Sequence, residues 1–266
     1  YNMNLYRGCQ HGCIYCDTRS ECYGINDIST ISVKRNALDL LTKELSSKRR
    51  SRATIGTGSM NDPYMPLEKE LELTRKALQM IASEKFPVHV ITKSNLVERD
   101  TDILQEISKI YAAVSFTITT ANDSLSRKIE PNAPEASGRF KAMDLLASKG
   151  IYTGITLMPV LPFINDTREN IETIVRQAKD SGASYIIPMF GVTLRKGSRD
   201  YFYRELDGKF PGVKEKYQSR FRGQYECFSA DYKILFDMFG ELSEKLGIHT
   251  KMQFYQPETY QQQSLF

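Results

Sequence analysis

The chain has 266 residues, of which 41% are hydrophobic, 11% aromatic and 26% charged. These proportions are those of an ordinary globular protein and exclude a disordered or collagen-like chain. Lys and Arg exceed Asp and Glu by four. This small positive net charge is compatible with a phosphate-bearing substrate but too small to indicate an extended nucleic-acid-binding surface.

Hydropathy gives no reason to place the chain in a membrane. No run approaches the ~20 apolar residues that span a bilayer, and no secretory signal pattern is present. Because residue 1 is Tyr rather than Met, we expect a short piece to precede it. We therefore expect a cytoplasmic protein without a membrane partner.

Apolar runs alternate with amphipathic segments along most of the chain. Short β-branched runs predict six strands, at residues 3–6, 53–56, 87–92, 112–119, 151–157 and 185–194. Apolar residues at helical spacing predict helices at residues 34–50, 67–85, 99–110, 136–149, 167–181 and 229–246. Residues 195–225 mix arginines with aromatics and are expected to form short helices.

Strands that alternate with helices favour parallel pairing, because each crossover returns the chain to the same end of the sheet. Six such units predict the α/β class, as a partial (β/α)6 barrel of the TIM type over about residues 1–195. A C-terminal helical extension follows over about 196–266, and we expect one domain over residues 1–266. In parallel barrels, functional residues follow the strands.

Three of the five cysteines fall within eight residues, in the segment GCQHGCIYC. Cys9, Cys13 and Cys16 have C-x3-C-x2-C spacing, and such clustering at one end points to a metal rather than to disulfides. A structural zinc site with His11 or Cys22 as fourth ligand is one interpretation. Three thiolates without a clear fourth ligand also suit a [4Fe–4S] cluster with one open iron.

Polar residues follow three of the predicted strands. The glycines of GTGSMNDPY (residues 56–64) favour an ordinary strand-to-helix turn. Lys93 ends a buried strand, where its ammonium calls for an anion unless it is simply exposed in a loop. Ser115, Thr117 and Thr119 alternate with apolar residues, so their hydroxyls share one face, toward a ligand or toward other polar side chains.

The cysteine spacing, with Tyr15 before the third cysteine, resembles the signature of the radical S-adenosylmethionine (SAM) superfamily. The later motifs make the chain similar to the spore photoproduct lyase-like branch of that superfamily over nearly its whole length. These motifs are DPY, TR (residues 74–75), TKS, RD (residues 99–100), SFTITT, EP-x-AP (residues 130–134) and the terminal SLF.

The resemblance implies that Cys9, Cys13 and Cys16 hold a [4Fe–4S] cluster whose open iron binds SAM. It implies that Lys93 meets the cofactor carboxylate and that Tyr15 lies near the adenine. Further cofactor-binding candidates at the barrel mouth are Ser59, Ser115, Thr117, Glu130 and Arg139. The family chemistry is reductive cleavage of SAM to a 5′-deoxyadenosyl radical, with an external electron donor such as flavodoxin or ferredoxin. No catalytic residue is assigned.

The photoproduct-repair enzyme of this branch is longer and has a cysteine that quenches a product radical. Here the spare thiols, Cys22 and Cys227, lie outside the segment expected to supply it. The shorter chain is more similar to the queuine lyase type, which implies release of queuine from queuosine or its 5′-phosphate by cleavage of the N-glycosidic bond. Arginines and aromatics in residues 195–225 agree with a small nucleoside or nucleotide substrate, although they could equally cover the barrel rim.

Two alternatives remain open at this point. One is a repair lyase for DNA photoproducts, and the other is a zinc-stabilised nucleic-acid-binding module. For the favoured lyase we expect no stable nucleic-acid partner.

Overall fold

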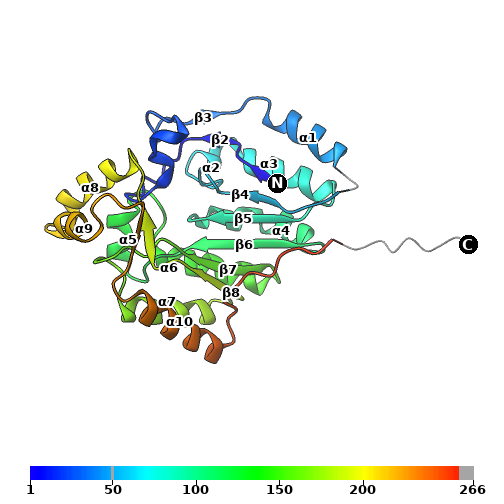
Figure 1. The fold of residues 1–266 in the computed structure, drawn as a ribbon. Helices are drawn as coiled ribbons and strands as arrows, with labels where there is room; N and C mark the ends of the chain where they lie inside the picture. Colours follow the sequence, from blue (N-terminus) through cyan, green and yellow to red (C-terminus); the bar gives the residue numbers. More distant parts are fainter. Residues whose placement is uncertain (49–50, 258–266) are drawn as a thin grey trace, which may run out of the picture.

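The computed structural model describes residues 1–48 and 51–257. Six parallel strands form its central sheet, in the order β1-β4-β5-β6-β7-β8 (Figure 1). Their bounds are Asn2–Met3, Ile55–Thr57, Val88–Thr92, Ala112–Thr117, Tyr152–Leu157 and Tyr185–Pro188. Spatial order follows chain order in this sheet, as it does when successive βα units build a barrel wall. This confirms the predicted α/β fold; β1 and β8 are the two edges, so the described strands form no closed barrel.

Helices follow the strands and bury their apolar stripes against the sheet. They are α1 (Ala37–Ser47), α2 (Glu68–Leu71), α3 (Leu73–Ser83), α4 (Thr101–Ser108), α5 (Asp123–Ile129), α6 (Ala136–Ser148) and α7 (Arg168–Asp180), with a 3-10 helix, η3 (Asn95–Asp100), before α4. Val114 and Phe116 of β6 are fully buried in one cluster with Ile103 of α4 and Met143 of α6. The alternate residues of β6 therefore face the concave side of the sheet.

The helix predicted over residues 67–85 is interrupted. Glu72 has φ +52 and separates α2 from α3. The carboxylate of Glu68 accepts the backbone N–H of Thr74 at 3.0 Å and that of Arg75 at 3.4 Å. A side chain thus satisfies the first amides of α3, and a second helix can start where apolar spacing predicts continuity.

The structure also departs from the prediction at the two edges of the central sheet. Instead of one strand over residues 3–6, β1 is followed by β2 (Tyr6–Arg7), which pairs antiparallel with β3 (Ser32–Val33). The predicted strand 185–194 is divided into two strands. β8 ends at Pro188, although the N–H of Met189 still bonds to the carbonyl of Leu157. β9 (Gly191–Thr193) then turns away from the central sheet and pairs antiparallel with β10 (Glu226–Phe228).

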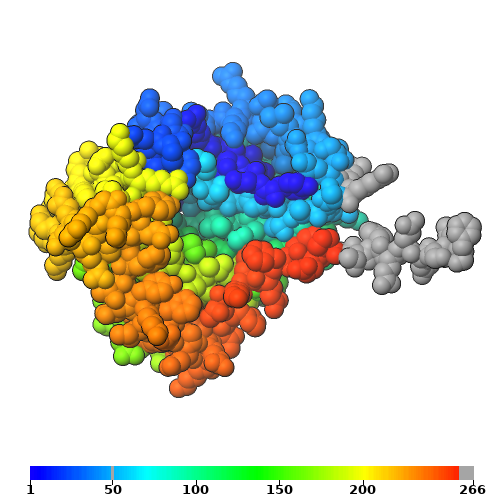
Figure 2. Space-filling view, in the orientation of Figure 1, coloured from blue at the N-terminus to red at the C-terminus, as the bar shows by residue number. Residues whose placement is uncertain are grey.

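The C-terminal extension is helical, as predicted. It consists of α8 (Ser198–Lys209), α9 (Val213–Phe221) and α10 (Tyr232–Leu246), and α10 packs beside α7 (Figure 1). Two 3-10 turns, η1 (Asp17–Arg19) and η2 (Glu21–Tyr23), meet α8 where blue and yellow residues touch in Figure 2. The terminal SLF and the end of the predicted helix 34–50 lie outside the described residues.

Membrane insertion has no structural support in the part of the chain that is described. Each helix there is too short or too polar to cross a lipid bilayer.

Candidate active site

A cavity of about 330 Å³ opens where residues 8–17, here the cysteine loop, meet the carboxyl ends of the central strands. It lies at the end of the sheet where parallel α/β folds place their ligands. The cavity brings together seven of the residues predicted from the sequence: Cys9, Cys13, Cys16, Tyr15, Ser59, Lys93 and Thr117.

Backbone hydrogen bonds fix the cysteine loop to its surroundings. The N–H of Cys9 donates to Ile28 at 2.8 Å, and that of Ile14 donates to Ile129 at 2.9 Å. The N–H of Asn132 donates to the carbonyl of His11 at 3.1 Å. The loop is thus shaped by neighbouring segments rather than by its own secondary structure.

All three cysteines of the loop are free thiols, and Cys13 is buried. Burial raises the pKa of Cys9 to about 11 and raises the pKa of Cys13 as well, although backbone N–H groups of His11 and Asp62 act in the opposite direction at Cys9. Thiolates at such positions need a bound cation to remain ionised. The three thiols therefore fit a metal group.

The donor set does not form a zinc site. Among residues 1–48 and 51–257, no three His, Cys, Asp or Glu side chains gather around a point that one metal ion could occupy. Both proposed fourth ligands are otherwise engaged, since His11 Nε2 lies 3.1 Å from Asp62 and Cys22 Sγ accepts from Arg195 at 3.5 Å. In a [4Fe–4S] cluster each thiolate binds a separate iron, so the three thiols need not converge on one point.

Lys93 supplies a cation to the same cavity. Its Nζ lies 5.8 Å from the centre of the Tyr15 ring. Burial alone would lower the pKa of Lys93, but the charges of Cys13 and Glu130 outweigh burial and raise that pKa. The side chain is therefore an ammonium that can meet an anionic group of a ligand.

Glu130 and Arg139 lie behind the cavity rather than in its wall. They form an ion pair at 2.6 Å, and each is 1% exposed. The Tyr15 hydroxyl donates to Glu130, and Arg139 Nη1 donates to the carbonyl of Thr117 at 2.8 Å. The pair thus supports two cavity-lining residues from outside.

The hydroxyl stripe of β6 divides between the cavity and the interior of the sheet. Thr117 lines the cavity and shares a hydrogen bond of 2.8 Å with Thr156. Ser115 does not line it: its Oγ lies 2.7 Å from Nε2 of His89 and 2.6 Å from the hydroxyl of Tyr185. The alternation along β6 correctly predicted that Ser115 and Thr117 share one face of the sheet. It did not predict that Ser115 lies too far from the strand end to reach the cavity.

The burial of His89 makes the free energy of unfolding pH-dependent. Burial lowers the pKa of His89 from 6.5 to about 4, so between these values the unfolded chain binds a proton that the folded chain does not. The free energy of unfolding should fall by up to about 3 kcal/mol as pH drops through this window, and be fully present above pH ~6.5. Urea unfolding at pH 7 and 4.5 measures this. In His89→Gln, which cannot titrate, the fall should be smaller by that amount; an equal fall in both proteins refutes the assignment.

Gly58 follows β4 and shapes the floor of the cavity. It has φ +83, and an added Cβ would lie 2.4 Å from the carbonyl oxygen of Ile91. A glycine is therefore required here by the close approach of the Ile91 backbone, and the same residue lines the cavity.

Gly58→Ala should destabilise the protein by at least about 2 kcal/mol, because a clash is added to an unfavourable φ. Gly138→Ala is the matched control, since Gly138 lies in α6 with no atom within 4 Å of the added Cβ. That change should be neutral or stabilising by up to ~1 kcal/mol in thermal or urea unfolding. Equal stabilities of the two variants would contradict the expectation.

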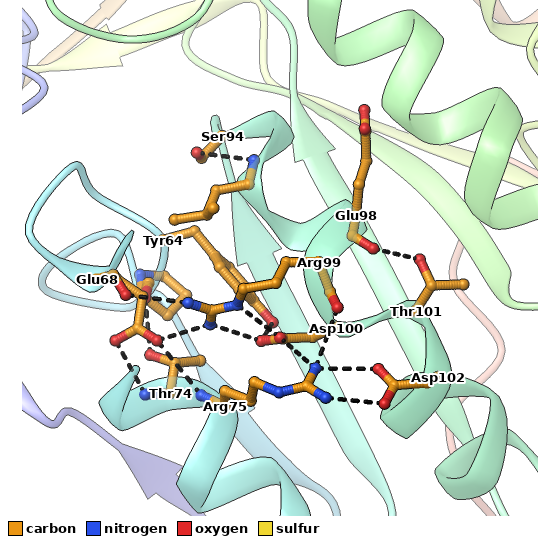
Figure 3. Close-up of polar contacts among 12 residues, drawn as sticks. Tyr64, Glu68, Thr74, Arg75, Ser94, Glu98, Arg99, Asp100, Thr101 and Asp102 are labelled. Carbon is orange, nitrogen blue, oxygen red and sulfur yellow. Dashed lines mark hydrogen bonds and ion pairs between the residues drawn. The ribbon is translucent and has the colours of Figure 1, made fainter. Parts of the chain in front are cut away.

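The TR and RD motifs meet in a buried network of charges beside the cavity (Figure 3). Arg75 Nη1 lies 2.9 Å from Asp100, and Arg99 pairs with Asp100 and with Glu68 at 2.8 Å each. The hydroxyl of Tyr64 donates to Asp100 at 3.0 Å. These motifs join α3 to η3 and do not line the cavity.

Arginines and aromatics also gather at the rim. The guanidinium of Arg195 lies 5.8 Å from the Tyr23 ring and 5.1 Å from the Tyr225 ring, and 3.8 Å from the carboxylate of Asp17, which lines the cavity. Arg19 stacks on Tyr201 at 3.7 Å. Phe202, Tyr217 and Phe221 instead cover the barrel, as the alternative interpretation of these aromatics expected, because they are buried in a cluster with Cys13 and Tyr15.

Sequence analysis missed several residues of the site. Asp62, Met158 and Met189 line the cavity, and His11 was considered only as a zinc ligand. The position of Asp62 in DPY, just after a strand, was the available signal. The methionines carry no signal of their own, because apolar residues at strand ends are common.

The family model for the radical SAM superfamily matches residues 3–178. The chain belongs to the radical SAM superfamily. Proteins of this superfamily use a [4Fe–4S] cluster and SAM, and the cysteine loop and Lys93 fit these cofactors. An uncharacterized protein of Methanocaldococcus jannaschii is 31% identical over 79% of this chain and 76% of its own.

Two further similarities carry functional names. A protein of Pseudomonas phage M6 named radical SAM Nalpha-GlyT isomerase is 26% identical over 68% of this chain and 37% of its own. The solved structure of spore photoproduct lyase with dinucleoside spore photoproduct superposes on this radical SAM protein with a TM-score of 0.69, at 16% identity, covering 94% of this chain and 75% of that one. At this identity the likeness concerns the fold.

Proposed function

We propose that Cys9, Cys13 and Cys16 hold the [4Fe–4S] cluster and that Lys93 binds the carboxylate of SAM. When bound, the reduced cluster and SAM supply a 5′-deoxyadenosyl radical that abstracts hydrogen from a substrate. The observation that carries this proposal is that the three thiols and the one ammonium line a single cavity. Tyr15, Ser59 and Thr117 remain proposed SAM contacts, whereas Ser115, Glu130 and Arg139 would act on SAM only from behind the wall.

The remaining wall is suited to holding a reactive species away from water. Met158, Met189 and Val192 contribute apolar side chains to the wall of the cavity. Apolar side chains exclude solvent and can pack against a planar ring. The protein's contribution is thus to orient SAM and substrate and to protect them.

The proposed substrate is a nucleoside or nucleotide, and the proposed reaction is release of queuine from queuosine or its 5′-phosphate. The rim supports a nucleotide, since Arg195 between Tyr23 and Tyr225 offers a cation and stacking faces beside the cavity. The dinucleoside of spore photoproduct lyase points to the same chemical class. We further propose a cytoplasmic enzyme reduced by a flavodoxin or ferredoxin.

Anaerobic incubation of reconstituted protein with queuosine 5′-phosphate, SAM and dithionite tests the reaction. Free queuine, 5′-deoxyadenosine and methionine should form together, and queuine should be absent without SAM. Formation of 5′-deoxyadenosine without free base would refute queuine release while leaving SAM cleavage intact.

Repair of a DNA photoproduct is the second candidate, favoured by the fold shared with spore photoproduct lyase. No thiol besides the three of the cysteine loop lines the described cavity, because Cys22 is exposed and Cys227 is buried beside Gln224. Dinucleoside spore photoproduct should therefore not be converted to thymidine, because no further thiol of the described cavity can return a hydrogen to the product radical. Stimulation of SAM cleavage with release of thymidine would reverse the order of the two candidates.

A further inference from the structure

Asp62 joins the two loops that carry the proposed cofactor ligands. It follows β4 and is 8% exposed. Its Oδ1 accepts the N–H of Tyr64 at 2.9 Å and the hydroxyl of Thr92 at 2.6 Å. Its Oδ2 accepts the N–H of Lys93 at 2.7 Å and lies 3.1 Å from Nε2 of His11. One oxygen therefore contacts both the Lys93 loop and the cysteine loop.

His11 transmits this contact to the thiols. It lies between Cys9 and Cys13 and is 2% exposed. Its second ring nitrogen, Nδ1, faces the carbonyl of Asn132 at 3.4 Å, so the imidazole is held from both sides. A buried ring fixed in this way cannot move without moving the backbone of the cysteine loop.

The electrostatics of Asp62 agree with a carboxylate that is kept for its partners. Burial alone would raise the pKa of Asp62, but the facing His11 and the hydrogen bonds from Thr92 and Lys93 hold that pKa below its ordinary value. A buried carboxylate is costly unless it is fully hydrogen-bonded. Closing the turn after β4 requires only the bond from the N–H of Tyr64, so the contacts of Asp62 with Thr92, Lys93 and His11 call for another explanation.

We propose that Asp62 is a positioning residue for SAM, which sets the cysteine loop and Lys93 at the separation that one SAM molecule requires. SAM must reach the open iron and the Lys93 ammonium together, and an error of about 1 Å in such an arrangement is costly. This inference rests on the proposed function, in which Lys93 binds the SAM carboxylate. Asp62 itself acts through His11 and the Lys93 backbone.

Asp62→Asn tests the inference, because the amide keeps an oxygen for Tyr64 and Thr92 but places an NH2 group opposite the N–H of Lys93 and removes the negative charge that faces His11. The dissociation constant of SAM is measured by equilibrium dialysis with labelled SAM, on anaerobically reconstituted protein without reductant or nucleoside. Iron and sulfide analysis normalises each variant to its loaded fraction. SAM should bind about 10- to 100-fold more weakly.

Asp123→Asn is the matched control. Asp123 also accepts a backbone N–H and a hydroxyl, both from Ser137, but it does not line the cavity. Its SAM affinity should stay within about 2-fold of the unmodified protein. An equal loss in both variants would overturn the inference.

A double-mutant cycle with Lys93→Ala separates positioning from direct binding. If Asp62 acts through Lys93, the double variant should bind SAM no more than about 3-fold more weakly than Lys93→Ala. Fully additive losses overturn the positioning role. A loss in Lys93→Ala without one in Asp62→Asn overturns this inference alone, whereas no loss in Lys93→Ala overturns the assignment of Lys93 as well. The substrate proposal is untouched, because no nucleoside is present.

His11→Gln provides a second variant in case Asp62→Asn yields little folded protein. It removes the imidazole bridge and leaves the bonds from Asp62 to the strand ends in place. SAM binding should weaken as in Asp62→Asn. Unchanged affinity in this variant would overturn the inference.

Discussion

Cys16→Ser is expected to give a folded but colourless protein that cleaves SAM at least about 100-fold more slowly. Loss of even an outer-shell partner of a metal ligand costs 10- to 100-fold, and here a ligand itself is removed. Cys16 is half-buried at the edge of the cavity, so a hydroxyl in its place should be tolerated by the fold. Iron analysis, visible absorbance and formation of 5′-deoxyadenosine measure the three effects.

Cys22→Ser is the control for this experiment. Cys22 is exposed in η2, and its sulfur contacts only the rim arginine Arg195 among the bonds described for it. This variant should keep the colour, iron content and SAM cleavage of the unmodified protein. A cluster that survives Cys16→Ser, or that is lost in Cys22→Ser, would contradict the proposed ligand set.

Asp100→Ala should cost about 3–5 kcal/mol of folding stability, the largest loss we expect from a residue outside the cavity. Asp100 is fully buried and accepts from Arg75, Arg99 and Tyr64 (Figure 3). Removing it takes the shared buried carboxylate from both guanidinium groups, leaving Arg99 with Glu68 and Arg75 with the exposed Asp102, and leaves the buried Tyr64 hydroxyl without its acceptor. Urea unfolding followed by far-UV circular dichroism measures the change.

Asp102→Ala separates this network from an ordinary surface pair. Asp102 also pairs with Arg75, at 2.9 Å, but its side chain is 63% exposed. The expected loss is at most about 1 kcal/mol, since water screens the pair. Comparable losses in the two variants would show that burial does not govern the strength of this network.

The central sheet could be predicted from the sequence because each strand has its own local signal. β5 and β6 are β-branched or apolar runs bounded by turns, and the structure places them within two residues of the predicted ends. The break at Glu72 and the turn into β9 could not be predicted from apolar spacing. The break depends on the side chain of Glu68, which accepts an amide of α3 six residues later, and β9 pairs with residues more than thirty positions away.

The candidate site shows the same division. The spacing of Cys9, Cys13 and Cys16 predicted that they lie together, and the position of Lys93 at the end of a strand predicted that it lies at the same cavity. Strand alternation could not show that Ser115 lies below the cavity, bonded to His89. Nor could it show that Asp62 and His11 face each other, since residues fifty positions apart carry no mutual signal in a single sequence.

The cluster that buries Cys13 and Tyr15 draws a third of its buried side chains from α8 and α9, through residues such as Phe202, Tyr217 and Phe221. The fragment of the chain that carries the cysteine motif is therefore not a self-sufficient module. A truncation for crystallisation, or a chimera that joins this barrel to the C-terminal region of a relative, would remove the apolar side chains of α8 and α9 that pack against the motif. Residues 198–228 should therefore be kept together with the cysteine motif in any shortened or chimeric protein.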